Sequence, residues 1–183
     1  MGTVIKCRLS VNSLRQAAAE VEKYRKSLKD KCHLFRKRLI EVGIDTAKSN
    51  CGDYTGMIVF EPQDGNQNTS YLVATDGEKI VREWMYKGGI KTATVSPLLM
   101  AEFGSGWLAK VLDDVSGYGQ GTFPGQKHAF DPNGWSWTTP DGERHHSEGE
   151  APTFPMYAAS MAMLFEVDCI GKEVFRTNEV IKC

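Results

Sequence analysis

Apolar positions recur at helical spacing along the first quarter of the chain. One series, in which Arg25 is the charged member, has successive residues alternately four and three positions apart. It consists of Leu14, Ala18, Val21, Arg25, Leu28, Cys32, Phe35, Leu39 and Val42. This spacing is that of an a/d stripe with charged residues filling the other faces. We predict a long helix over 11–43, which Asn12 or Ser13 caps and Gly43 ends.

The stripe on this helix has two compatible interpretations. In the first, the helix packs on a sheet of its own subunit. In the second, it makes contacts between subunits. The charged residue Arg25 and the small residue Ala18 weaken a true coiled coil, so packing on a sheet is favoured.

Short β-branched and apolar segments follow the predicted helix. We expect an antiparallel sheet over 56–112, with strands at 57–61, 71–74, 79–85, 90–95 and 98–103. Asp76-Gly77 is a strong hairpin signal between the second and third of these strands. Gly88-Gly89 marks a further turn.

The pattern is lost between 113 and 152, where glycines and aromatic residues replace any helical or strand period. A stretch of this length without regular structure is uncommon and usually functional, and this one is too aromatic for simple disorder. Trp135-Ser136-Trp137 and the segment 143–146 flank a Pro-Asp-Gly turn. We therefore predict a structured insertion that contains a small β-hairpin.

The last predicted element is a helix over 153–176, with Thr153 as its cap and Pro155 in its first turn. Its residues from 156 to 165 are apolar nearly all the way round, so every face has to be covered, by the sheet or by another subunit. The complete chain is expected to be a single α+β domain over 1–183. Its long N-terminal helix and C-terminal helix pack on a mainly antiparallel sheet, with a large aromatic and glycine-rich insertion.

Composition and charge narrow the class of protein. The 183 residues are 41 % apolar and 25 % charged, which is ordinary for a globular chain. We expect no membrane contact and no secretory leader, and the five scattered cysteines favour reduced thiols. Residues 11–50 carry ten Lys/Arg and five Asp/Glu, whereas the remainder carries twelve and eighteen. This split predicts a face that meets something acidic, either another copy or nucleic acid.

The residue patterns do not point to an enzyme or a cofactor. Acidic residues and histidines cluster between 141 and 150, but adjacent His145 and His146 would point to opposite faces of a strand, which does not suit a metal site. Ser105 lacks a nucleophile elbow, and the glycines at 117–121 lack the lysine of a phosphate loop. The insertion hairpin is too acidic to bind nucleic acid. We predict no catalytic, metal-binding or cofactor-binding residue.

Several motifs in a fixed order resemble a known family. They extend over about 10–176 and consist of Ser13-Leu14, Glu22, Tyr24, Leu28, Leu39, Gly43, the segment 96–104 with Glu102-Phe103-Gly104, Phe123-Pro124-Gly125-Gln126 with His128 to Phe130, the hairpin from Trp135 to Gly149, and Ala151 to Ala159 with Pro155-Met156-Tyr157. Together they resemble the tail-completion or head–tail joining proteins of tailed phages and prophages of Gram-positive bacteria.

The resemblance implies a non-enzymatic protein of the virion, made in the cytoplasm of the host bacterium and placed at the neck or upper end of the tail. It implies a homo-oligomeric ring, most simply a hexamer, that contacts neighbouring connector proteins and the tail tube and through which genomic DNA could pass. Tail terminator and head–tail adaptor both remain open. The alternative from another class is a carbohydrate-binding module that uses Trp135 and Trp137.

Aromatic anchors surrounded by polar residues are typical of protein interfaces. The residues expected to contact a neighbouring subunit or partner lie in the insertion and at the start of the last helix. They are Phe123, Phe130, Trp135, Trp137, His145, His146, Met156 and Tyr157.

Overall fold

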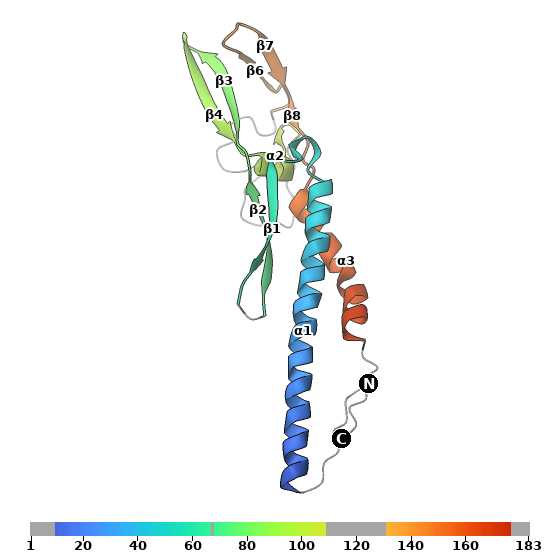
Figure 1. Ribbon diagram of the computed structural model, residues 1–183. Helices are drawn as coiled ribbons and strands as arrows, with labels where there is room; N and C mark the ends of the chain where they lie inside the picture. The colour runs from blue at the N-terminus through green and yellow to red at the C-terminus, as the bar shows by residue number, and fades with distance from the viewer. Residues whose placement is uncertain (1–9, 67, 109–130, 177–183) are drawn as a thin grey trace.

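The computed structural model describes residues 10–66, 68–108 and 131–176. The molecule is elongated, and helix α1 (Val11–Ser49) runs along much of its length (Figure 1). Helix α3 (Pro155–Phe175) lies beside the C-terminal half of α1. The rings of Phe35 and Phe175 are 5.7 Å apart, and Gly43 faces Met163 further along, so the two helices run antiparallel.

Helix α1 passes through Gly43 and ends only at Ser49, so the predicted stop at Gly43 is wrong. A Cβ atom at this position would lie 2.8 Å from the Met163 sulfur and 3.0 Å from a methyl group of Leu72. Glycine is therefore present because α1 passes close to both α3 and β2. The start was predicted within two or three residues: Ser10 is the N-cap, and its Oγ accepts a hydrogen bond from the Ser13 N–H.

The strands form antiparallel pairs, which confirms the predicted α+β class. In the described residues they make four separate two-stranded ribbons rather than one continuous sheet. The pairs are β1 (Ile58–Asp64) with β2 (Ser70–Asp76), β3 (Ile80–Tyr86) with β4 (Gly89–Val95), β5 (Ser105–Gly106) with β8 (Gly149–Glu150), and β6 (Trp135–Thr138) with β7 (Arg144–Ser147).

The chain does not form a hairpin at Asp76-Gly77, contrary to the sequence signal. β2 pairs with β1, and the Gly77 N–H donates to the Met57 carbonyl at 2.8 Å. The Asp76 carboxylate instead accepts hydrogen bonds from the Ser96 hydroxyl (2.9 Å) and the Leu98 N–H (3.0 Å). The β1–β2 ribbon therefore ends at Asp76, and the chain continues into the β3–β4 ribbon. The β3–β4 turn lies at Lys87-Gly88, both at positive φ, as a tight hairpin turn requires.

The segment predicted as a strand at 98–103 is a helix, α2 (Pro97–Phe103). Ser96 is its N-cap and accepts a hydrogen bond from the Leu99 N–H at 3.2 Å, while Pro97 occupies the first turn. The apolar run that suggested a strand is short, and such runs are ambiguous between strand and buried helix. The cap residues decide in favour of the helix.

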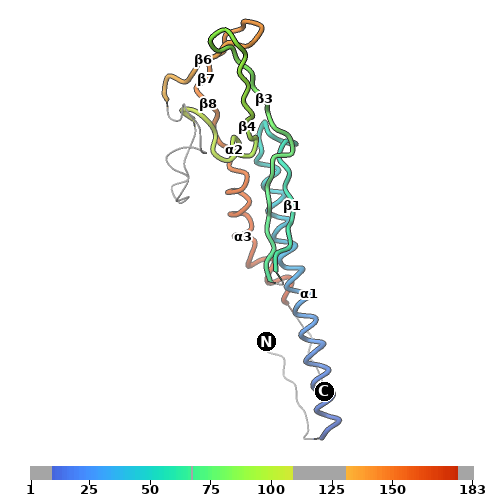
Figure 2. Tube along the Cα trace, turned by 90° about the vertical axis from the view of Figure 1, so that its left-hand side faces the viewer, coloured from blue at the N-terminus to red at the C-terminus, as the bar shows by residue number. Residues whose placement is uncertain are grey.

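The hydrophobic core lies where the C-terminal end of α1, the short helix η1 (Gly52–Tyr54), β1, α2 and the first half of α3 meet. It is built from Ala47, Cys51, Tyr54, Ile58, Phe60, Met100, Ala101 and Ala159. Figure 2 shows the β3–β4 and β6–β7 ribbons beyond this core at one end, and the N-terminal half of α1 projecting at the other.

The predicted stripe on α1 does not face a single core. Leu14, Val21 and Leu28 are 49, 51 and 40 % exposed, and the buried residues of the helix are Ile40, Gly43 and Ala47. Because α3 ends beside Phe35, it does not pack on the N-terminal half of α1.

Candidate interaction surfaces

The predicted Trp hairpin is confirmed as the β6–β7 ribbon. Trp137 pairs with His145 and Ser136 with His146 across the two strands. Strand β6 also contacts β3, so the two ribbons lie together at one end of the molecule (Figure 1).

The two faces of this hairpin differ. Trp135, Trp137 and His145 are half-buried on one face, and Trp137 stacks on His145 with ring centroids 5.3 Å apart. The Trp135 and Trp137 rings are 6.5 Å apart. On the other face, His146 is exposed and its Nδ1 lies 3.1 Å from the Ser136 hydroxyl. The two adjacent histidines thus point to opposite faces, as predicted.

The turn of the hairpin is held by polar groups. The Thr139 N–H donates to the Glu143 carbonyl at 2.9 Å, and the Thr139 hydroxyl donates to the Asp141 carboxylate. That hydroxyl, together with a backbone N–H, holds the pKa of Asp141 below its usual value. The turn between β6 and β7 is therefore held by its own polar groups.

The other predicted interface residues are not on this hairpin. Phe123 and Phe130 lie outside the described residues. Met156 is half-buried and Tyr157 is exposed in the first turn of α3. The structure thus brings together four of the predicted residues and places two elsewhere.

The start of α3 is capped by Glu102 from α2, not by Thr153 as predicted. The residue at the N-cap position, Phe154, is in the left-handed conformation and has no side-chain cap. The Glu102 carboxylate accepts hydrogen bonds from the Met156 N–H (2.8 Å) and the Tyr157 N–H (3.1 Å). Burial raises the pKa of Glu102, and these two hydrogen bonds oppose that shift.

The segment after Glu102 fixes the same junction. Gly104 has a positive φ of 67°, and a Cβ there would collide with the Glu150 carbonyl of β8. The Thr153 and Phe154 N–H groups both donate to the Ala101 carbonyl, at 2.8 and 3.0 Å. Residues that are far apart in the chain therefore meet at one junction between α2, β8 and α3.

The outer face of α3 carries exposed apolar side chains. Leu164 is 65 % and Phe165 74 % exposed, and Tyr157 is also exposed. The described residues therefore do not cover every face of this helix, and coverage of the exposed face by another subunit stays a prediction. Large exposed apolar groups that cluster on one surface usually mark a contact site.

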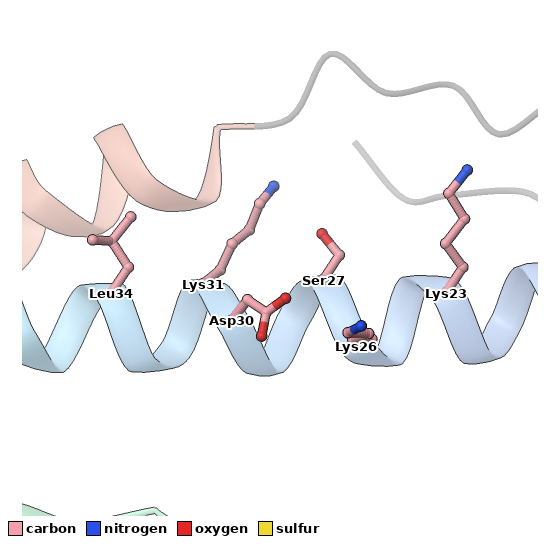
Figure 3. Close-up of a pocket in the computed structure, with 6 residues that line it drawn as sticks. All are labelled: Lys23, Lys26, Ser27, Asp30, Lys31 and Leu34. Atoms are coloured by element: carbon pink, nitrogen blue, oxygen red, sulfur yellow. The ribbon is translucent and has the colours of Figure 1, made fainter.

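The N-terminal half of α1 presents a basic surface. A shallow groove of about 420 Å³ runs along it, and Figure 3 shows the side chains of Lys23, Ser27, Lys31 and Leu34 on one side of the helix. Arg25 lies on another face, where its guanidinium pairs with Glu22 at 2.7 Å. Residues 11–34 contain six Lys/Arg and three Asp/Glu. The positive balance of residues 11–50 is therefore spread along α1, and 11–34 carries three of the five net positive charges.

Sequence reasoning missed the two features that define these surfaces. Glu102 was noted within a motif but not as a cap, because a cap supplied from another helix leaves no local signal. The exposure of Leu164 and Phe165 was missed because an all-apolar helix does not say which face is buried.

Within residues 10–66, 68–108 and 131–176, no three His, Cys, Asp or Glu side chains gather as a metal site. None of the helices described there is both long and apolar enough to cross a bilayer.

No family model, no curated protein and no solved structure matches this chain. The resemblance to phage tail-completion proteins therefore stays a prediction from the quoted motifs.

Proposed function

We propose that this chain is a structural subunit of a tailed-phage virion, which assembles into a ring at the head–tail junction or the upper end of the tail. The observation that carries the proposal is the exposed apolar surface of α3, where Leu164 and Phe165 are among the most exposed large hydrophobic residues of the described chain. A subunit of a ring has to offer such surfaces to its neighbours.

The position of the motifs gives further support. The Glu102-Phe103-Gly104 and Pro155-Met156-Tyr157 motifs, which carry much of the resemblance, meet through the hydrogen bonds of Glu102 to the first turn of α3. Two motifs that contact each other in the fold can share one structural requirement. Their joint occurrence is therefore a better family signature than two unrelated matches.

The proposed ring contacts the connector and the tail tube, and the hairpin is the surface we assign to the adjoining ring. Trp135 and Trp137 lie on a projecting ribbon that is far from the exposed face of α3 (Figure 1). An elongated subunit with separate surfaces can contact its own copies and a second protein at the same time.

The experiment is the double substitution Trp135→Ala, Trp137→Ala in the full chain, with Ser136→Ala on the opposite face as the matched control. We expect near-native circular dichroism, intact rings by negative-stain electron microscopy and lost joining to isolated tails. Ser136→Ala should leave joining intact. Rings that join tails normally but lose binding to a glycan would establish the carbohydrate module instead. A wild-type chain that neither forms rings nor joins tails would refute the proposal.

A further inference from the structure

Helices α1 and α3 each carry an exposed stripe along one side. We call the first the α1 stripe, which comprises Leu14, Ala18, Val21, Arg25, Leu28 and Cys32. The second, the α3 stripe, comprises Tyr157, Met161, Leu164, Asp168, Gly171 and Phe175. Most of their apolar residues are more than a third exposed, and Met161 is half-buried.

The two stripes match in spacing and length. In each, successive residues lie 4, 3, 4, 3 and 4 positions apart, so the sequence of intervals reads the same in both directions. Each stripe spans about 27 Å at the helical rise of about 1.5 Å per residue. Such a/d spacing is what two packed helices need to interlock.

Each stripe has one charged residue, and the charges are opposite. In an antiparallel pairing Arg25 lies opposite Leu164, and Val21 opposite Asp168. Side chains on a helix lean toward the N-terminus. Arg25 therefore leans toward the level of Val21, and Asp168 toward the level of Leu164, so that the two charges approach each other.

The surroundings have the same complementarity. Helix α3 contains three Asp/Glu and one Lys, whereas residues 11–34 of α1 contain six Lys/Arg and three Asp/Glu. Pairing two α1 stripes would instead bring two basic segments together. The ion pair of Arg25 with Glu22 is exposed, so giving it up costs little.

The shape of α3 also suits a docked helix. A groove of about 610 Å³ lies at the C-terminal end of the α3 stripe, lined in part by Phe35, Val167, Gly171 and Phe175. In the antiparallel register, Leu14 of a docked helix lies opposite Phe175, and Ala18 lies opposite Gly171. That layer also contains the Phe35 ring of the same chain, which lies against Gly171.

Within the described residues, the α3 stripe and the α1 stripe of one chain do not reach each other. Helix α3 ends beside Phe35, and the α1 stripe of the same chain lies beyond that point (Figure 1). Within the chain α1 and α3 already run antiparallel, so a neighbour in a similar orientation presents its α1 antiparallel to this α3. Because the two surfaces differ, the contact is head-to-tail and closes into a ring when the rotation between copies permits.

We propose that the α1 stripe of one copy packs antiparallel along the α3 stripe of the next copy, with Arg25 and Asp168 forming an ion pair across the contact. This inference rests on the proposed ring and assigns the surfaces that hold its subunits together. The face of α1 that carries Arg25 then contacts a neighbouring subunit, whereas the groove lined by Lys23 and Lys31 lies on another face of the helix.

The test is a charge exchange in the full chain, with assembly followed by analytical ultracentrifugation. We expect Arg25→Glu and Asp168→Arg each to weaken association about tenfold or more, as the loss of a desolvated ion pair does. The double variant should recover most of the wild-type association. Lys26→Glu makes the same charge change one residue outside the stripe and should have little effect. Circular dichroism checks that each variant is folded.

Disulfide trapping tests the register. In a background where the other cysteines except buried Cys51 are serine, chains with Leu28→Cys are mixed with chains carrying Met161→Cys. The antiparallel register predicts a mixed disulfide, and Leu28→Cys with Gly171→Cys, which face each other only in a parallel pairing, should give none. The reverse result would overturn the proposed pairing.

The outcomes separate this inference from the proposed function. Rings that form unchanged in both single charge variants would overturn the stripe pairing alone. Unchanged rings together with lost binding to double-stranded DNA in Arg25→Glu would assign α1 to nucleic acid instead. A wild-type chain that stays monomeric would overturn both proposals.

Discussion

Glu102 in α2 caps α3 through the backbone of Met156, 54 positions later in the chain, with a hydrogen bond of 2.8 Å from the Met156 N–H to the carboxylate. The first N–H groups of a helix have no partner within the helix, and a carboxylate there also interacts favourably with the helix dipole. The bond therefore fixes the direction in which α3 leaves the core.

Removal of this cap should weaken the fold. Glu102→Ala is expected to lower the free energy of unfolding by about 0.5–2 kcal/mol, the usual cost of losing a helix cap. Glu102→Gln keeps an acceptor oxygen and should lose less. Urea denaturation followed by circular dichroism measures both. Equal stability of wild type and Glu102→Ala would show that the cap contributes nothing.

The same carboxylate should make stability depend on pH. Burial raises the pKa of Glu102 above its ordinary value of 4.5, so the folded state binds this proton more tightly than the unfolded state. The contribution of Glu102 to stability therefore falls as pH rises from about the ordinary pKa through the raised one. The free energy of unfolding should fall with rising pH across this range more in wild type than in Glu102→Gln. Parallel pH profiles of the two proteins would contradict the raised pKa.

Gly43 should not accept a large side chain. Its missing Cβ leaves room for Met163 and Leu72, so Gly43→Leu should destabilise the fold by about 1–3 kcal/mol, as overpacking does. Met163→Ala in the same chain should recover part of the loss. A double-mutant cycle by chemical denaturation measures the coupling, and purely additive effects would place the strain elsewhere.

The two halves of α1 should respond differently to truncation. Ile40 is 7 % exposed and Ile40→Ala should cost about 2–5 kcal/mol, whereas Leu28→Ala should cost far less in the dissociated monomer. Denaturation at a concentration where the chain is monomeric makes the comparison. Equal losses at the two positions would mean that the α1 stripe is buried within the subunit.

The stability of the hairpin turn should depend on the protonation of the Asp141 carboxyl. The Thr139 hydroxyl and a backbone N–H lower the pKa of Asp141, so its contribution to the hairpin is present at neutral pH and is lost as pH falls through that lowered pKa. Thr139→Val should raise the pKa toward 3.8, the ordinary value. Carbon-detected nuclear magnetic resonance of the Asp141 carboxyl follows this directly, and an unchanged midpoint would argue against the hydroxyl.

Local patterns predicted the elements that are determined by local interactions. The period of α1, the Trp135–Trp137 hairpin and the helix after Pro155 could be read from residue spacing and turn residues. The α+β class followed from these elements. The predicted single domain over 1–183 stays a prediction.

The sequence-based predictions fail where a contact with residues distant in the chain determines the local structure. Gly43 looks like a helix end but accommodates Met163 and Leu72, and Asp76 looks like a turn residue but binds the start of α2. The exposed face of α3 could not be separated from its buried face, because both are apolar. At Gly43 and Asp76, tertiary contacts therefore override the local preference of the residue.

The most direct measurement is native mass spectrometry of the purified full chain in parallel with negative-stain electron microscopy. A ring subunit should give one dominant closed oligomer, with six copies as the expected number, and ring-shaped particles with a central opening. A chain that remains monomeric at every concentration tested, or that forms only open filaments of variable length, would contradict the proposed function.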